Sequence, residues 1–194
     1  MTTSPDRPDA ELARAAASGD ERAYAELVRR HKDGLYRLLR RYVGDPDDAY
    51  EAAHEAFIAA WSALPRYDPN RPFGAWLKTI AINKARDRAR RLAVRRFFFG
   101  SKSLEDSGAL EVEDGGEAAD ATVMATQRRG ALDQAIAGLP DGLRGPLILT
   151  ALEGCSHQEA GDILGLSAKT VEMRAYRARK LLAETVPANY RDGD

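Results

Sequence analysis

The sequence lacks the features of secreted, membrane-spanning and disulfide-bonded proteins. Its single cysteine, Cys155, excludes an internal disulfide framework. No apolar run in it approaches the roughly 20 residues that are needed to cross a bilayer. The first residues, MTTSPDRPDAE, lack the basic-then-apolar order of a signal peptide. We therefore expect a cytoplasmic protein that does not insert into a membrane.

Signatures of catalysis and of cofactor binding are equally scarce. The sequence contains no phosphate-binding loop such as GxxxxGK[ST] and no recognisable pair of nucleophile and base. Cys155 and His157 have no further metal ligands nearby in the sequence, which falls short of a zinc pattern. We expect no enzyme activity, no cofactor and no metal, and the sequence leaves a redox role for Cys155 open.

The chain has almost no net charge, yet its charges are segregated. Among 194 residues, 29 are Lys or Arg and 30 are Asp or Glu. Residues 78–96 hold eight basic residues and one acid, residues 101–120 hold one basic residue and seven acids, and residues 168–182 hold five basic residues and one acid. Two basic blocks around an acidic one indicate two contacts with an anionic partner, joined by a segment that avoids it.

Apolar residues recur at helical spacing along most of the chain, and no segment alternates like a β-strand. Helices are predicted over about 20–42, 47–63, 73–95, 122–137, 143–153, 156–164 and 168–184. Trp61 is assigned to a buried face, and Leu132 belongs to the apolar stripe of its helix. Because proline breaks a helix interior, the regular part of the fifth helix is expected to start near Pro146.

These patterns predict an all-α protein of two small helical bundles. We expect a disordered N-terminus over residues 1–8, a first bundle over 9–96 and a flexible acidic linker over 97–121. A second bundle is expected over 122–186 and a tail over 187–194.

The end of the second bundle has the pattern of a helix-turn-helix. Ser156 and Glu159 have the spacing of a capping box, GLS turns the chain, and a basic helix follows. The major groove of DNA admits such a helix, whose first turns reach base edges. The residues with that placement are Lys169, Thr170, Glu172 and Met173, followed by Arg174 and Arg177. A solvated basic face of an ordinary bundle would give the same pattern.

The first basic block lies beside aromatic residues. Lys84, Arg88, Arg91 and Arg95 form one helical stripe that suits contact with phosphates. The preceding loop, LPRYDPNRPF, contributes Tyr67, Asn70 and Arg71, and Trp76 follows it. Aromatic rings beside a basic surface are typical of single-stranded DNA binding, because unstacked bases stack on them. Core packing is the alternative for Trp76.

A third feature has the opposite charge: Asp48, Glu51 and Glu55 form an acidic stripe. The three residues share the helix face that points away from Ala53 and Phe57. DNA would repel this stripe, so it either binds a basic protein surface or is simply solvated.

Three segments in this order resemble a known family. DDAYEAAHEAFIAAW, then FGAWLKTIAINKARDRARR, then the segment 139–182 ending in GLSAKTVEMRAYRARKLL are similar to bacterial sigma factors of the extracytoplasmic-function group. The resemblance spans residues 11–182. It implies a non-catalytic subunit of RNA polymerase, whose region two binds the core enzyme and opens the −10 element and whose region four reads the −35 element as duplex. It also implies an anti-sigma factor as a partner.

The resemblance assigns roles to individual positions. It implies polymerase binding by Asp48, Glu51 and Glu55, with His54 between them. Contact with the −10 element is expected from Tyr67, Asn70, Arg71, Trp76, Asn83, Lys84, Arg86 and Arg90. Contact with the −35 element is expected from Lys169, Thr170, Glu172, Met173, Arg174 and Arg177.

The sequence departs from the family at Tyr50 and His54, where an acid and a glutamine are usual, and at Glu172 and Met173, where lysine and serine are common. A stand-alone helix-turn-helix repressor or activator is the alternative. It accounts for the second bundle but leaves the acidic stripe and the first basic block without a role.

Overall fold

The computed structural model describes residues 7–99 and 130–185. Within these residues every regular element is a helix, which confirms the predicted all-α fold. The first bundle comprises α1 (Asp9–Ala17), α2 (Glu21–Val43), α3 (Pro46–Ala63), a short 3₁₀ turn (Leu64–Arg66) and α4 (Phe73–Phe99). The second comprises a helix over residues 130–137, α6 (Asp141–Leu147), a π-helical turn (Ile148–Leu152), α7 (His157–Leu164) and α8 (Ala168–Thr185).

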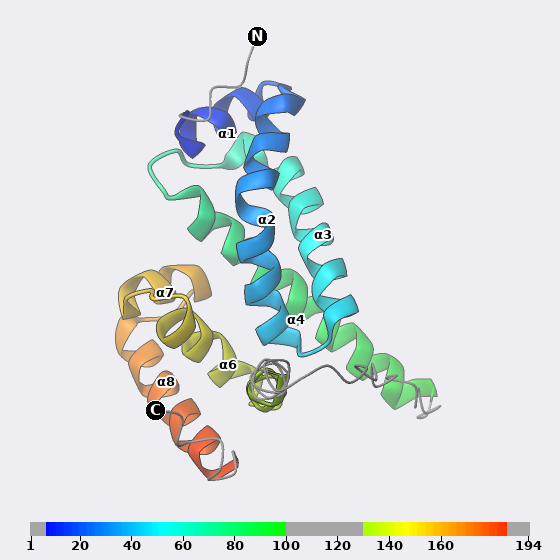
Figure 1. Ribbon diagram of the computed structural model, residues 1–194, viewed down its shortest axis with the longest axis vertical. Helices are drawn as coiled ribbons and strands as arrows, with labels where there is room; N and C mark the ends of the chain where they lie inside the picture. The colour runs from blue at the N-terminus through cyan, green and yellow to red at the C-terminus, as the bar shows by residue number, and fades with distance from the viewer. Residues whose placement is uncertain (1–6, 100–129, 186–194) are drawn as a thin grey trace, which may run out of the picture.

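Figure 1 shows the two bundles as separate groups of helices, with α6–α8 beside the lower end of α2 and the first half of α4. The helix α4 continues to Phe99, beyond the predicted boundary at residue 96. The described residues leave out most of the predicted linker and the start of the second bundle. They also leave out most of both predicted terminal segments.

Local capping fixes the ends of α2 and α3. The Asp20 side chain accepts hydrogen bonds from the N–H groups of Arg22 and Ala23, at 3.0 and 3.1 Å. Gly44 ends α2 in the left-handed region, with φ of 86°. Asp45 then caps α3 through the N–H of Asp48, at 2.8 Å. The break predicted between these helices is therefore confirmed.

Small residues on α3 form the centre of the first bundle. The buried residues of this helix are Ala49, Ala52, Ala53, Ala56 and Ala60. The burial predicted for Trp61 is wrong, because its side chain is 37% exposed. The alanines leave no room for an indole between the helices, so the Trp61 ring lies at the edge and packs on Tyr24, with ring centroids 4.8 Å apart.

The helix around Pro146 starts earlier than predicted. α6 begins at Asp141 and contains Pro146 in its interior. Both Gly145 and Pro146 are buried, and a Cβ on Gly145 would lie 3.0 Å from the Leu164 side chain of α7. The helix therefore accommodates a proline in its interior, at a buried position where proline removes one backbone hydrogen bond. Burial of Leu132 is also not observed, since its side chain is 42% exposed, whereas Ile136 is buried.

The helix-turn-helix is built as predicted. The Ser156 and Glu159 side chains form a capping box at the start of α7. Gly165 turns the chain with φ of 68°, and the N–H of Leu166 donates to the carbonyl of Gly161 at 2.9 Å. Ser167 accepts from the N–H of Thr170 at 3.2 Å and so caps α8. The inward residues of α8 are Val171, Ala175 and Ala178.

Helix length and composition also bear on membrane association. Among residues 7–99 and 130–185, no helix is both long enough and apolar enough to cross a membrane.

The turn of the helix-turn-helix should not tolerate a side chain at Gly161. A Cβ there would lie 2.5 Å from the carbonyl oxygen of Leu166, a backbone atom that cannot move without opening the turn. Gly161→Ala should therefore lower the free energy of unfolding by about 1–3 kcal/mol, measured by urea denaturation.

Gly34→Ala is the matched control, because Gly34 lies within α2 and a Cβ added there would meet nothing within 4 Å. It should stabilise the protein by about 0.5–1 kcal/mol through helix propensity. If both substitutions change stability by the same amount, the turn is wider than the structure indicates.

Candidate functional site

The predicted DNA-reading residues of α8 divide into two groups. Lys169, Glu172, Met173 and Arg177 are exposed on the outer surface of the second bundle. Thr170 is half-buried, and its hydroxyl shares a hydrogen bond with the Ser167 hydroxyl at 2.8 Å, within the helix cap. The exposed group can reach a base edge or a phosphate, while Thr170 serves the helix start.

Arg174 is half-buried and leans toward the neighbouring helix. Its guanidinium lies 3.7 Å from the position that a Cβ on Gly142 of α6 would occupy. It therefore lies at the edge of the outer surface of α8 rather than at its centre.

Two residues of α8 that were not predicted share its outer surface. Tyr176 is 66% exposed and Lys180 is exposed. With Lys169 and Met173 they follow the spacing i, i+4, i+7 and i+11, which marks a single helix face. This spacing is visible in the sequence, and an exposed tyrosine between basic residues would have been the signal.

The predicted residues of α4 are not equally accessible. Asn83 and Arg90 are exposed, and Lys84 is half-buried. Arg86 points toward the second bundle, where its Nε lies 3.2 Å from an Asp141 carboxylate oxygen and donates to the Tyr42 hydroxyl at 3.1 Å. The second bundle therefore covers Arg86 in this arrangement.

The predicted acidic stripe is not a bare acidic surface. The Arg88 guanidinium contacts Asp48 at 2.7 Å, Glu51 at 3.0 Å and Glu55 at 3.7 Å. Arg91 contacts Glu55 at 3.5 Å. The hydrogen bond with Asp48 raises the pKa of Arg88 above its ordinary value.

This pairing changes the interpretation of both stripes. Arg88, for which a phosphate contact is predicted, joins α4 to α3 through Asp48, and the phosphate contact stays a prediction. The side chain of Arg95 lies outside the described residues. On α3 the Glu51 side chain remains 61% exposed, and His54 is exposed beside it. A basic partner would therefore meet Glu51 first and would share the other carboxylates with Arg88.

The aromatic residues near the loop pack on one another. Tyr67 is only 9% exposed, and its hydroxyl donates to the Arg71 carbonyl at 2.6 Å. Its ring centroid lies 5.6 Å from that of Phe73 and 5.0 Å from that of Trp76. Trp76 is half-buried, while Asn70 and Arg71 are exposed. Tyr67 thus shapes the loop and offers no free ring face here.

The environment of Cys155 does not favour chemistry at its thiol. The Cys155 thiol is half-buried, and burial raises its pKa, which disfavours the reactive thiolate. No group of three or more potential metal-binding side chains occurs within residues 7–99 and 130–185.

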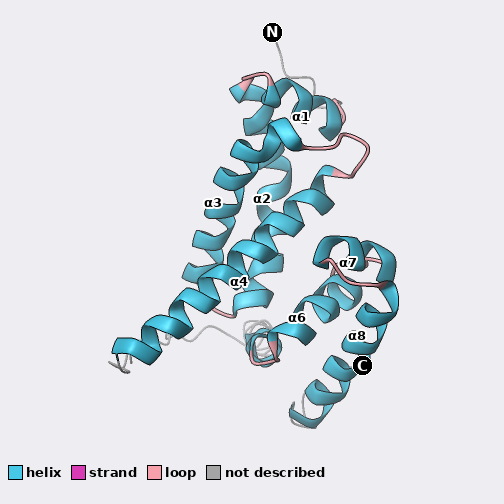
Figure 2. Cartoon of the chain, turned by 180° about the vertical axis from the view of Figure 1, so that it is seen from behind, coloured by secondary structure: helices cyan, strands magenta, loops and turns pink. Residues whose placement is uncertain are grey.

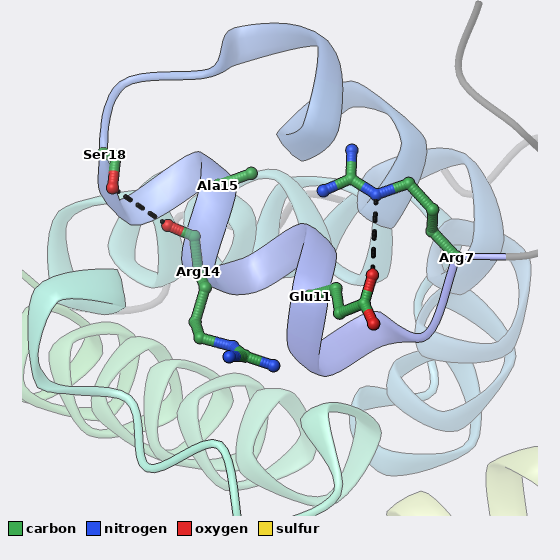
Figure 3. A pocket seen from close by; sticks show the side chains of 5 residues that line it. All are labelled: Arg7, Glu11, Arg14, Ala15 and Ser18. Atoms are coloured by element: carbon green, nitrogen blue, oxygen red, sulfur yellow. Dashed lines mark hydrogen bonds and ion pairs between the residues drawn. The ribbon is translucent and has the colours of Figure 1, made fainter.

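An open hollow on α1 is lined by Arg7, Glu11, Arg14, Ala15 and Ser18 (Figure 3). Arg7 and Glu11 pair at 3.9 Å, and the Ser18 hydroxyl donates to the Arg14 carbonyl at 3.2 Å. Because these polar groups contact one another, we assign the hollow no ligand.

Comparison with known families matches both bundles. The family described as Sigma-70 region 2 matches residues 27–95, and the family described as Sigma-70, region 4 matches residues 129–182. The chain is 39% identical over 189 residues to the RNA polymerase sigma factor CnrH of Cupriavidus metallidurans, covering 95% of this chain and 97% of the relative. It is 33% identical to the ECF RNA polymerase sigma factor SigW of Bacillus subtilis, covering 84% of this chain and 89% of the relative.

Solved structures of sigma factors also match the chain. CnrH in complex with the cytosolic domain of CnrY matches with a TM-score of 0.63 and 34% identity, covering 91% of this chain and 96% of that chain. The sigma factor RpoE in complex with the anti-sigma factor NepR, from Bartonella quintana, has a TM-score of 0.65 at 20% identity, covering 83% of this chain and 94% of that chain. The second likeness supports the fold alone.

Removal of Arg88 should reveal the repulsion within the acidic stripe. In Arg88→Gln, three carboxylates lose their shared counter-charge, and the free energy of unfolding should fall by about 0.5–1 kcal/mol at low salt. The loss should shrink in about 1 M NaCl, because salt screens the repulsion. Arg37→Gln, at an exposed position on α2, should cost little under either condition. Equal losses for both variants, or a loss that salt does not change, would contradict the pairing.

Proposed function

Because the chain belongs to the extracytoplasmic-function group of bacterial RNA polymerase sigma factors, we propose that its two bundles divide promoter recognition between them. Residues 9–96 hold core RNA polymerase and the −10 element, and residues 122–186 hold the −35 element. The chain acts in the cytoplasm by binding, and core polymerase supplies the chemistry. The observation that carries this proposal is the capped helix-turn-helix whose α8 presents basic side chains outward.

Reading of the −35 element falls to the exposed surface of α8. Lys169, Glu172 and Met173 lie in its first turns, where a helix in the major groove meets base edges. A glutamate accepts a hydrogen bond from cytosine, and an apolar side chain contacts the thymine methyl group. Arg177, further along the helix, suits a phosphate.

Opening of the −10 element falls to α4 and the loop before it. Asn83 and Arg90 on the helix, with Asn70 and Arg71 on the loop, are exposed and polar or basic. Such groups can hold unpaired bases and their backbone. We assign Tyr67 a structural role in the loop, because its ring is buried and its hydroxyl is bonded to Arg71.

We assign the binding of core polymerase to the outer surface of α3. Asp48, Glu51, His54 and Glu55 share this surface with Tyr50, which is 70% exposed. A polymerase surface that is basic and partly apolar fits this combination. Since CnrH was solved in complex with the cytosolic domain of CnrY, we further propose that an anti-sigma factor binds this chain.

Neutralising Glu51 and Glu55 of the stripe should weaken polymerase binding. In Glu51→Gln/Glu55→Gln, Asp48 still pairs with Arg88, so helicity and melting temperature should stay close to those of the parent. Affinity for core RNA polymerase should fall on the order of tenfold, with a smaller difference at high salt. Fluorescence anisotropy of labelled chain, titrated with core enzyme at low and at high salt, measures the affinity and its salt dependence.

Glu21→Gln/Asp33→Asn is the control, because it removes two exposed acids of α2 and changes the net charge equally. Equal affinity of both double variants for polymerase would argue against the α3 surface. Specific promoter binding by the isolated parent, indifferent to polymerase, would favour a stand-alone repressor.

Substitutions on α8 should separate base reading from phosphate contact. Glu172→Ala should relax preference at one promoter position by about 1–3 kcal/mol, whereas Arg177→Ala should weaken all −35 sequences alike and lower the salt slope by about one. Transcription by the reconstituted holoenzyme on a panel of −35 mutants measures this. Glu184→Ala, in the last turn of α8, should behave like the parent. If all three variants give the parental profile, α8 does not read the −35 element.

A further inference from the structure

One guanidinium lies among the carboxylates that we propose to bind polymerase. Arg88 of α4 donates to Asp48 of α3 through both Nε and Nη2, at 2.9 and 2.7 Å. Its Nη1 donates to Glu51 at 3.0 Å and lies 3.7 Å from Glu55. Arg91 lies 3.5 Å from Glu55 as well. In this ion cluster, three carboxylates against two guanidiniums leave a net charge of −1.

Arg88 points away from the face of α4 that carries the proposed −10 contacts. Asn83 and Arg90 are seven residues apart, so they share one helix face. Arg88 precedes Arg90 by two residues, which is about 200° around a helix with 3.6 residues per turn. The Arg88 side chain is 24% exposed, against 76% for Arg90. The face that carries Arg88 is therefore the one turned toward α3.

The ion cluster lies on an outer side of the first bundle. Figure 2 shows the start of α3 next to the second half of α4, with α6–α8 on the opposite side. The Glu51 side chain is 61% exposed, and those of Asp48 and Glu55 are each 33% exposed. A partner protein can therefore reach these carboxylates without any rearrangement of the bundles.

A basic surface that approaches the ion cluster competes with Arg88 for the same oxygens. Guanidinium and ammonium groups of a partner bind carboxylates through the charge-assisted hydrogen bonds that Arg88 already makes. Arginine is charged throughout the physiological pH range, and the hydrogen bond with Asp48 raises the pKa of Arg88 further. Deprotonation therefore does not release the carboxylates, and a competing cation has to displace Arg88 from them.

We propose that Arg88 is a specificity-determining residue of the polymerase-binding surface, an internal cation that a polymerase cation displaces from Asp48 and Glu51. The inference rests on the proposed function of α3 in binding core polymerase. Arg88 lowers the affinity for core enzyme, because the partner gains its contacts only by breaking those of Arg88. It also discriminates against weakly basic surfaces, since these do not outweigh the ion pairs already present.

The first test removes the internal cation from the full-length chain. Arg88→Gln changes the net charge of the ion cluster from −1 to −2, so its affinity for core polymerase should rise about threefold at low salt. The gain should shrink in about 1 M NaCl. Fluorescence anisotropy of labelled chain, titrated with core enzyme, measures this affinity. Arg37→Gln is the matched control, with the same charge change at an exposed position of α2. If Arg88→Gln binds core enzyme no more tightly than this control, the proposal is wrong.

A double-mutant cycle shows whether Arg88 acts through the acidic stripe. Asp48→Asn removes the carboxylate that receives two of its hydrogen bonds, so adding Arg88→Gln to this variant should increase affinity by less than it does in the parent. An equal gain in both backgrounds would contradict competition at the stripe.

Arg88→Lys keeps the proposal testable if circular dichroism shows that Arg88→Gln is unfolded. Lysine retains the charge but lacks the planar fork of donors, so it should hold Asp48 less firmly. This variant should therefore still bind core enzyme more tightly than the parent, and an affinity equal to or below the parental value would count against the proposal.

Strand binding separates this role from a phosphate contact. If Arg88 contacted DNA, holoenzyme assembled with Arg88→Gln would bind fluorescein-labelled single-stranded DNA more weakly than holoenzyme assembled with Arg37→Gln. We expect equal affinities, because Arg88 lies on the face of α4 turned toward α3. Weaker strand binding by Arg88→Gln would overturn the proposal in favour of the phosphate contact.

The Glu51→Gln/Glu55→Gln variant distinguishes failure of this inference from failure of the proposed function. If that variant loses affinity for polymerase while Arg88→Gln matches Arg37→Gln, α3 binds polymerase and only the role of Arg88 is wrong. If Glu51→Gln/Glu55→Gln binds polymerase like its own control on α2, the proposed polymerase surface itself is wrong.

Discussion

The close approach of α3 to its neighbours is the constraint on which the charged surfaces of the first bundle depend. Helix separation follows the size of the side chains at the contact, and α3 presents alanines there. Alanine also loses no side-chain entropy when it is buried. With α3 held close, its outer carboxylates come within reach of Arg88 on α4. A wider spacing would leave both stripes unpaired.

That pairing shows why charge counted along a chain differs from charge presented to a partner. The block over residues 78–96 is strongly basic in sequence, but Arg88 is balanced by α3, and Lys78 and Arg86 by the second bundle. Exposed Asn83 and Arg90 remain on α4. On α8 the basic residues Lys169 and Arg177 stay on the surface. The two blocks are both basic in sequence, but their basic side chains differ in how far other elements pair with them.

Local signals predicted the helices and the helix-turn-helix, because Asp20, Ser156 and Ser167 act on N–H groups two or three residues away. Their effect needs no knowledge of the rest of the fold. The errors came from contacts distant in sequence. Pro146 lies buried within α6, and Trp61 lies at the edge of the bundle, where it packs on Tyr24.

In the candidate site too, local signals predicted positions correctly and contacts distant in sequence were missed. Glu172 and Met173 are exposed on α8, where helix periodicity places them. Arg86 and Arg88 have the same chemistry as Arg90, and only the fold decides that they face Asp141 and Asp48. Tyr67 likewise resembles an aromatic platform in sequence, yet its ring packs against Phe73. Sequence periodicity does not predict which side chains on different helices contact one another.

The arrangement of the surfaces suggests an order of events for the proposed function. α3, which carries the surface proposed for polymerase, lies on the side of the first bundle away from α6–α8 (Figures 1 and 2). It is therefore accessible while the bundles contact each other. Lys78 and Arg86 of α4 are not, because Glu153 and Asp141 pair with them. The Lys78–Glu153 pair is mostly shielded from water, and the buried Tyr42 donates to Asp141, so a partner that binds the bundles in separate places has to outweigh these contacts together. Polymerase bound at α3 would supply that difference in affinity, so DNA binding would follow polymerase binding rather than precede it.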